Sequence, residues 1–196
     1  MALDPDIRLV LGVVVGKRVG ETAVALLEEV KPRLGGRTPE LVTSDEWSAY
    51  PEAIRRVFGE GGTPEGLNYA TVHKTRAKGR VVAVATRIVM GLLAVVTGLL
   101  GGSKVNTSYV ERQNATDRHH NARKGRKTYR FSKAFEAHEA MTHFTMYGYN
   151  YCWPVRTLRQ KVGPRRYRSR TPAMAAGLTD HVWSLREWLA FPACQP

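Results

Sequence analysis

The chain has 196 residues, of which 43% are hydrophobic, and its 30 Lys and Arg against 17 Asp and Glu give a formal net charge of +13. This length and apolar content predict one folded domain, with room for an appended tail, and exclude an intrinsically disordered chain. The excess of positive charge points to nucleic acid or an anionic surface as the partner.

Cysteine content and apolar runs exclude several further classes. Cys152 and Cys194 are too few for a disulfide framework or a zinc site, so a reducing cytoplasm is the expected location. Asp4 and Asp6 precede the first apolar run, unlike the cationic start of a secretory signal. The nearly uncharged run 88–102 is 15 residues long. It is shorter than the roughly 18 residues of a membrane span and predicts a buried strand end and helix.

The first elements combine a hairpin, a helix and a strand. Turn residues before an apolar β-branched run predict a hairpin over 1–16 whose first strand is nearly absent. Apolar residues at helical spacing predict a helix over 21–34. A short strand over 40–45 ends on Asp45, at the sheet edge where α/β proteins place their active crevice. Asp45 as an N-cap of the following helix is an equally good interpretation.

The middle of the chain continues the alternation of helix and strand. We expect a helix over 49–58, a Gly- and Pro-rich loop over 59–66, and β-type stretches over 68–72 and 80–90. A helix over 135–151 carries aromatic side chains, which we interpret as core residues and not as platforms for stacking bases.

The C-terminal part has a different character. Residues 154–196 are predicted to lack strands and to hold basic residues, with one small helix over 182–189. Trp183 and Trp188 of this helix are expected to dock on the body of the protein.

Basic residues are clustered. Eight of them lie within 112–133 and seven within 156–170, so that two short tracts hold half of all Lys and Arg. A merely solvated surface would spread these charges and intersperse acids. Contact with a polyanion is the expected role of both tracts.

Glu111 stands at the head of the first tract. Ser108 and Glu111 have the spacing of a capping box, in which both side chains satisfy free N–H groups at the start of a helix. The alternative is that Glu111 binds a metal ion beside a nucleic-acid phosphate, and one residue can do both.

Several strings resemble one known family. NTSYVERQN at 106–114, followed by RKGRK at 123–127 and FSK at 131–133, resembles the block around the last acid of bacterial insertion-sequence transposases of the DDE class. TSDEWSAY at 43–50 resembles the segment that bears the second catalytic Asp.

The ends of the chain add to this resemblance. Residues 2–4 and 8–10 resemble the second and third strands of the RNase H-like fold. The region 156–159, followed by TPAM at 171–174, resembles the C-terminal tail of the family.

The resemblance implies an α/β fold, with an RNase H-like mixed sheet flanked by helices over 1–150 and a basic tail over 151–196. Asp45 would be the second acid and Glu111 the third, and both would bind Mg²⁺ or Mn²⁺. The first acid has no counterpart, because it would lie upstream, and Asp4 falls on the wrong strand. We therefore expect a first strand that is missing or incomplete, and a truncated copy.

The implied function is DNA transposition: cleavage at transposon ends to free a 3′-hydroxyl, then attack of that hydroxyl on target DNA, by two-metal-ion chemistry. The expected partners are transposon-end and target DNA, which implies association with the nucleoid, and a homo-oligomer is left open. The residues expected to bind DNA are polar and basic side chains of the first tract: Arg112, Asn114, Arg118, His120, Arg123, Lys124, Arg126, Lys127 and Lys133. A non-catalytic nucleic-acid-binding protein is the alternative, and a third metal-binding acid would distinguish the two.

Overall fold

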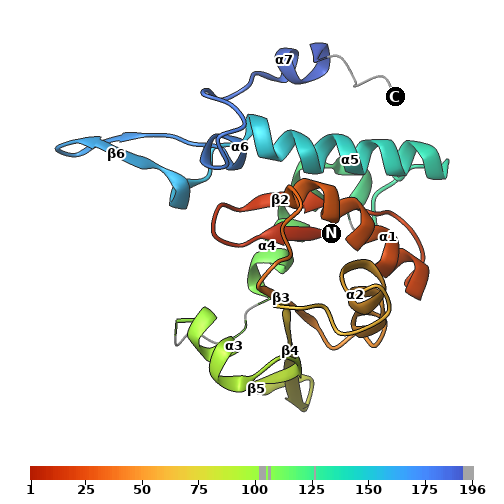
Figure 1. Cartoon of the computed structure of the whole chain (residues 1–196). Coiled ribbons are helices and arrows are strands. Elements are labelled where there is room, and N and C mark those ends of the chain that lie inside the picture. The colour runs from red at the N-terminus through yellow and green to blue at the C-terminus, as the bar shows by residue number, and fades with distance from the viewer. Residues whose placement is uncertain (102–104, 106, 126, 192–196) are drawn as a thin grey trace. The chain divides into compact units, whose positions relative to one another are not determined.

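The computed structural model describes residues 1–101, 105, 107–125 and 127–191 (Figure 1). Contacts between residues divide the chain into two compact units. Unit 1 comprises Met1–Val15 and Arg112–Pro196, and unit 2 comprises Gly16–Glu111. Helices together with parallel and antiparallel strand pairs confirm the predicted α/β class. The predicted domain boundary at residue 150 stays a prediction.

Unit 2 begins with the predicted amphipathic helix. Helix α1 spans Gly20–Val30 and continues into a 3-10 turn, Lys31–Leu34. The turn ends at Gly35, whose φ of 61° lies in the left-handed region that glycine adopts without strain. The buried side chains of α1 include Ala23, Leu27 and Val30, which recur at helical spacing on one face.

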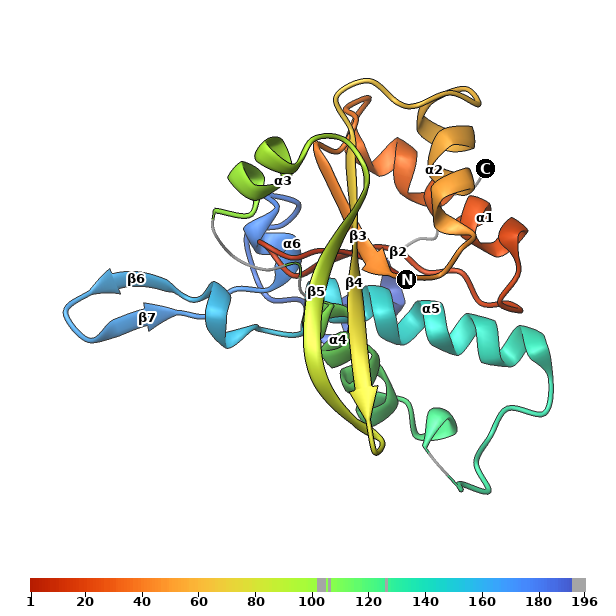
Figure 2. The same cartoon turned by 90° about the horizontal axis from the view of Figure 1, so that it is seen from below.

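The sheet of unit 2 has the strand order β3-β4-β5 (Figure 2). Strand β3, Leu41–Asp45, pairs in parallel with β4, Asn68–Ala77, and helix α2, Tyr50–Phe58, forms the connection between them. Strand β5, Arg80–Met90, returns antiparallel to β4. These elements confirm the sequence-based prediction, although β4 runs five residues beyond the predicted end at 72.

The two faces of this sheet carry separate cores. On one face, Tyr69 packs with α1 and α2, where Ile54 is fully buried. On the other face, Ala70 and Val72 pack with Val96 and Val105. The alternation of side chains along β4 produces this division, because successive residues of a strand point to opposite faces.

The expectation that the run 88–102 is buried was wrong for most of its described residues. Helix α3, Leu93–Leu99, places only Val96 in the core, while Leu92 and Leu93 are each 70% exposed. A helix this short contacts the sheet along one narrow stripe, so its other apolar side chains remain outside.

Unit 1 is built around the long helix α5, Phe135–Cys152, and the hairpin of β1, Ala2–Asp4, with β2, Leu9–Gly12. The Asn150 side chain ties the two together. Its Oδ1 accepts a hydrogen bond from the Val10 backbone N–H at 2.9 Å, and its Nδ2 donates to the Val10 carbonyl at 2.9 Å. Met146 packs beside them against Val10 and Val13.

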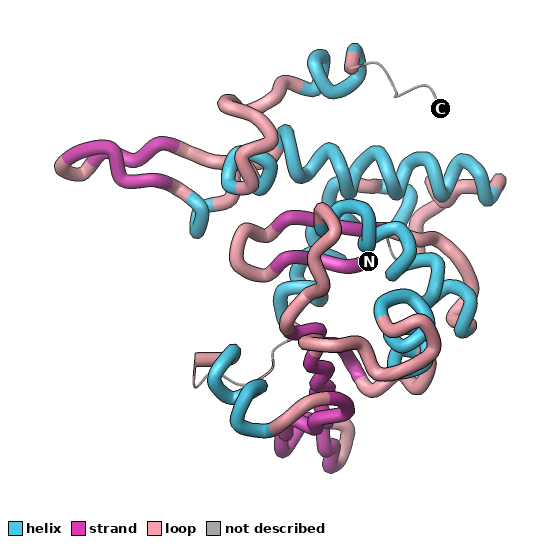
Figure 3. The backbone as a smooth tube through the Cα atoms, in the orientation of Figure 1, coloured by secondary structure: helices cyan, strands magenta, loops and turns pink. Residues whose placement is uncertain are grey.

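The second basic tract contains strands, so the expectation that residues 154–196 lack them was wrong. A 3-10 turn, Arg156–Leu158, precedes strands β6, Gln160–Gly163, and β7, Arg166–Arg168, which form a hairpin (Figure 3). Arg165, in the turn of the hairpin, has a φ of 56°. The charged side chains conceal the hairpin in the sequence because none of its strand residues is fully buried.

The last elements dock on α5 as predicted. Helix α6, Pro172–Ala175, is followed by α7, Leu185–Ala190. The Trp188 ring stacks on Tyr151 with centroids 5.7 Å apart, and Trp183 lies 4.7 Å from the same ring. The expectation that the aromatic residues of α5 are core was wrong for Phe135, which is 54% exposed.

Two further expectations concern membranes and cysteines. Within the described ranges, no helix combines the length and apolar character of a membrane span. Cys152 is a free thiol, and Cys194 lies outside the described residues.

Candidate functional site

Asp45 lies at the C-terminal end of β3, as predicted. Its Oδ2 forms an ion pair with Arg18 Nη2 at 3.1 Å, and the two side chains are 62% and 66% exposed. The Arg18 guanidinium also lies 5.1 Å from the centre of the Trp47 ring. The N-cap residue of α2 is Ala49, so the interpretation of Asp45 as that cap was wrong.

Glu111 lies in the first turn of helix α4, Ser108–His120. Its Oε1 accepts hydrogen bonds from Lys74 Nζ at 2.6 Å and from the Thr107 hydroxyl at 3.1 Å. The Thr107 carbonyl accepts from the Glu111 N–H, so Glu111 is the fourth helical residue. The capping box of Ser108 and Glu111 stays a prediction.

The two acids are linked through strand β4. Asp45 is in register with Val72 on the parallel neighbour, and Lys74 follows two residues later on the same face. Two residues of strand and one strand spacing place the Asp45 and Lys74 Cα atoms about 8 Å apart. Lys74 binds Glu111 directly, so β4 connects the end of β3 to Glu111. The Asp45 carboxylate itself acts on the Tyr50 and Tyr69 hydroxyls, whose pKa values are raised by burial and further by the Asp45 charge.

The opposite face of the same strands carries different chemistry. Ser44 and Tyr69 share a hydrogen bond of 2.6 Å, and burial raises the pKa of the Tyr69 hydroxyl. His73 Nδ1 lies 2.7 Å from a Glu46 carboxylate oxygen. Alternation directs Ser44 and Asp45 to opposite faces within the strand, but at the strand end the Asp45 charge still adds to the raised pKa of the Tyr69 hydroxyl.

The donors present do not complete a two-metal site. Among the described residues, no group of three or more His, Cys, Asp or Glu side chains could hold a metal ion. Asp45 and Glu111 are each compensated by a cationic side chain, and two Mg²⁺ ions need more oxygen ligands than two carboxylates supply. These two residues by themselves therefore do not fit a pair of metal ions.

Arg18 and Lys74 are the ion-pair partners of the two acids, and sequence reasoning missed both. Lys74 follows the predicted end of its strand at residue 72, and Arg18 lies in a loop between predicted elements. The only feature that could have identified Lys74 is the two-residue repeat of side-chain direction along β4, which puts Lys74 on the same face as Val72.

The exposed part of α4 carries several of the expected DNA-binding residues. Arg112 and Arg118 are exposed and Asn114 is half-buried. The His120 ring packs 4.0 Å from the Trp153 ring, and burial, with His119 adding to it, lowers the pKa of the His120 imidazole. The role of His120 in DNA contact stays a prediction.

Lys124 has an internal partner. Its Nζ lies 2.6 Å from Asp117 Oδ2, and the two side chains are only 16% and 4% exposed. The Thr145 hydroxyl donates to the other Asp117 carboxylate oxygen at 2.8 Å. Lys124 thus compensates a buried acid of α4, a role that its place in a basic tract concealed.

A pocket of about 630 Å³ lies between the 3-10 turn Ala122–Lys124 and the start of α5. It is lined by three cations, one aromatic ring and three alanines: Arg123, Arg130, Lys133, Phe131, Ala122, Ala134 and Ala137. Arg123 and Lys133 were expected to bind DNA, whereas Arg130 and the 58% exposed ring of Phe131 were not. Lys127 is exposed close by in the sequence, and Arg126 lies outside the described residues.

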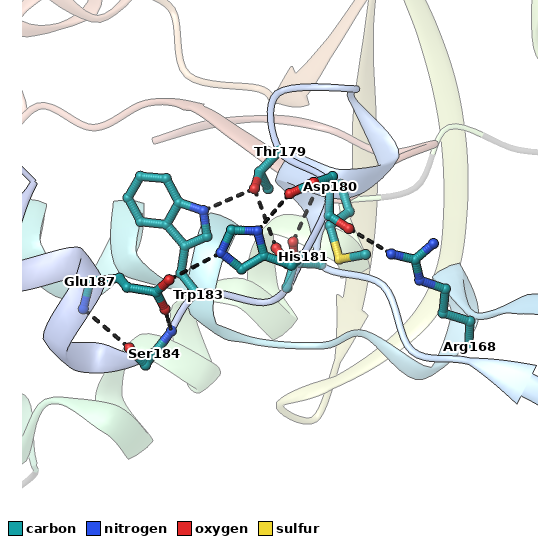
Figure 4. Close-up of polar contacts among 9 residues, drawn as sticks. Arg168, Thr179, Asp180, His181, Trp183, Ser184 and Glu187 are labelled. Atoms are coloured by element: carbon teal, nitrogen blue, oxygen red, sulfur yellow. Dashed lines mark hydrogen bonds and ion pairs between the residues drawn. The ribbon is translucent and has the colours of Figure 1, made fainter.

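The second basic tract is partly neutralised by the segment that follows it. Arg168 Nη2 donates to the Asp180 carbonyl at 2.6 Å, and His181 bridges Asp180 and Glu187 (Figure 4). The Asp180 hydrogen bond, followed by that from Glu187, raises the pKa of His181. Arg159 instead covers the Tyr167 ring at 4.1 Å. This tract is therefore partly a structural network.

Comparison of the chain with protein-family models, with curated proteins and with solved structures finds no match.

Proposed function

We propose that the chain is a DNA-binding protein of the DDE transposase class, in which Asp45 and Glu111 are two acids of the DNA-processing site. The observation that carries the proposal is the arrangement of unit 2. A strand-end Asp and a helix-borne Glu, distant in sequence and both located by the family strings, are connected through adjacent strands, because β4 pairs with the end of β3 at Asp45 and its Lys74 binds Glu111.

The strand pairings are of the kinds that an RNase H-like sheet contains: the parallel pair β3–β4 with the α2 connection, and the antiparallel hairpin β1–β2. In this structure the hairpin and β3-β4-β5 are separate sheets. The resemblance assigns 2–4 and 8–10 to its second and third strands.

The chain's own residues would bind and position DNA. Exposed cations such as Arg112 and Arg118 would hold phosphates, which fixes position without reading sequence. Arg18 and Lys74 keep Asp45 and Glu111 ion-paired until another cation replaces them. Exposed pairs of this kind contribute about 0–1 kcal/mol, so a divalent ion can displace them. Mg²⁺ or Mn²⁺ would supply phosphodiester activation, and a complete centre requires at least one further acid.

The alternative function is a non-catalytic DNA-binding protein. It is favoured by the ion pairs that occupy both acids, and by the lack of a third ligand among the described residues. In that case Asp45 and Glu111 are surface acids with structural cationic partners, and DNA binding is independent of divalent ions.

The two functions differ in how divalent ions affect DNA affinity. At constant ionic strength, we expect Ca²⁺ to strengthen binding of duplex DNA, because it screens two carboxylates that face the phosphates. Asp45→Asn and Glu111→Gln should lose this response. Glu28→Gln, which removes an exposed acid of α1, should retain it as the matched control.

Fluorescence anisotropy with labelled duplex measures the effect. If Ca²⁺ does not change the DNA affinity, or changes it equally in all three variants, the result would support the non-catalytic alternative. No binding of duplex at low salt would overturn both functions.

A further inference from the structure

We propose that the pocket lined by Arg123, Arg130, Phe131 and Lys133 binds an unpaired nucleotide of a DNA strand, with its phosphate on the cations and its base on the ring. The inference rests on the proposed DNA binding and deepens it, because it assigns strand-end or distorted DNA as the form that the pocket selects.

The charges of the pocket are uncompensated within the described part of the chain. Arg123, Arg130 and Lys133 all line one cavity, no acid lines it, and none of the three forms an ion pair with a described carboxylate. Lys124, in the same segment, does have such a partner in Asp117. Like charges around one cavity repel one another, so an anion with several oxygens is the complementary ligand.

The size of the pocket points to more than a phosphate. A volume of about 630 Å³ lies in the range of sites that hold molecules of nucleotide size. Phosphate-sized anions would leave most of it filled with water. The three alanines contribute methyl groups, which are apolar and carry no negative side-chain oxygen that would repel a phosphate.

Phe131 supplies the second half of the recognition. Its ring is 58% exposed and lines the same pocket as the cations. Aromatic side chains beside a cationic groove are the usual platform for bases of single strands, because every base has a face that stacks. This pairing of ring and cations distinguishes a nucleotide from inorganic phosphate.

The N-terminus of α5 supports the same assignment. Ala134, the N-cap residue, lines the pocket, and its side chain cannot satisfy the free N–H groups of the first turn. These groups favour an anion at this end of an 18-residue helix. Glu136 lies in that turn but does not line the pocket.

A paired nucleotide cannot fill this site. Bases inside a duplex are stacked on both faces, so the Phe131 ring can stack on a base only after that base leaves the stack or where it is already unpaired. Blunt duplex should therefore contact the surrounding cations without occupying the pocket.

The test compares a blunt duplex with the same duplex bearing an unpaired 3′ extension, using the full chain and anisotropy. We expect the extension to strengthen binding by about five- to a hundredfold, the range that stacking of one base provides. Phe131→Leu, which keeps an apolar side chain, should abolish most of this preference, and Arg130→Gln should reduce it. Lys161→Ala, an exposed cation of β6, should weaken both duplexes equally.

A fluorescent base analogue in the extension gives a second readout, since stacking on Phe131 should quench it in the native chain and not in Phe131→Leu. Equal affinity for both duplexes would overturn the pocket and leave DNA binding intact. Failure of both duplexes to bind would overturn the proposed function itself. If a free mononucleotide or inorganic phosphate competes for the protein as strongly as the duplex with the 3′ extension does, the assignment to a DNA strand would be overturned.

Discussion

Replacement of Lys124 by Met should destabilise unit 1 strongly, although Lys124 lies in a basic tract. Asp117 is 4% exposed, and apart from Thr145 its carboxylate is compensated by the Lys124 ammonium at 2.6 Å. Removing one partner of a buried ion pair costs about 3–5 kcal/mol, because the other charge is left buried. Lys124 is 16% exposed and water can partly reach the site, so we expect the lower end, about 3 kcal/mol.

Urea unfolding in a Trp47→Phe background measures this loss, because the three remaining tryptophans all lie in unit 1. Lys127→Met is the control, since an exposed lysine should change the unfolding free energy by less than about 0.5 kcal/mol. Adding Asp117→Asn to Lys124→Met should recover part of the loss. Equal stability of the Lys124 and Lys127 variants would show that the pair is not structural and that Lys124 is available to DNA.

Two other predictions follow from the charges of unit 1. A plot of the logarithm of the DNA association constant against the logarithm of salt concentration should become shallower in Arg123→Ala and in Lys127→Ala, by about 0.9 for each phosphate contact that is lost. The slope should not change in Lys124→Met. The second concerns pH. The raised pKa of His181 means that its stabilising contacts are complete below its ordinary pKa of 6.5 and disappear as pH rises through the raised value. The pKa values of Asp180 and Glu187 are lowered, so both carboxylates remain charged at the pH values where His181 is protonated. Near-ultraviolet circular dichroism of the tryptophan cluster should follow this transition, and His181→Gln should remove it.

Local patterns were sufficient for most of the elements. The apolar spacing of Ala23, Leu27 and Val30 specifies a helix without knowledge of its partner. The run that ends on Asp45 likewise identified a strand and its acidic end. These features are encoded within a few residues of one another, so the sequence alone could place them.

Pairings between distant residues could not be predicted in the same way. The Lys74–Glu111 and Lys124–Asp117 contacts depend on which strand and helix faces meet, and a charge count treats every lysine alike. The β6–β7 hairpin was missed because its side chains are mostly exposed, so no apolar alternation marked it. The exposure of Leu92 and Leu93 was not predicted, because an apolar run in the sequence does not show that the sheet covers only a small part of α3.

The chain as given should bind DNA without cutting or joining it in Mg²⁺. Asp45 and Glu111 are two carboxylates where a pair of hard cations requires more negative charge, while the phosphates would be held by Arg and Lys elsewhere. Asp4, at the end of β1, is the further acid that a complete set would have to recruit. However, its Oδ1 accepts hydrogen bonds from the Asp6 and Ile7 N–H groups at 2.9 and 3.3 Å, which gives it a structural role in the β1–β2 turn.

Release of a labelled 3′ end from an oligonucleotide substrate measures cutting, with the unaltered chain, Asp4→Asn and Glu111→Gln side by side. All three should bind and none should cut. Cutting by the unaltered chain that disappears in both variants would refute this reasoning, because Asp4, Asp45 and Glu111 would then form a complete catalytic set. Cutting that survives Glu111→Gln would instead remove Glu111 from the site, and with it the argument from the Lys74 contact.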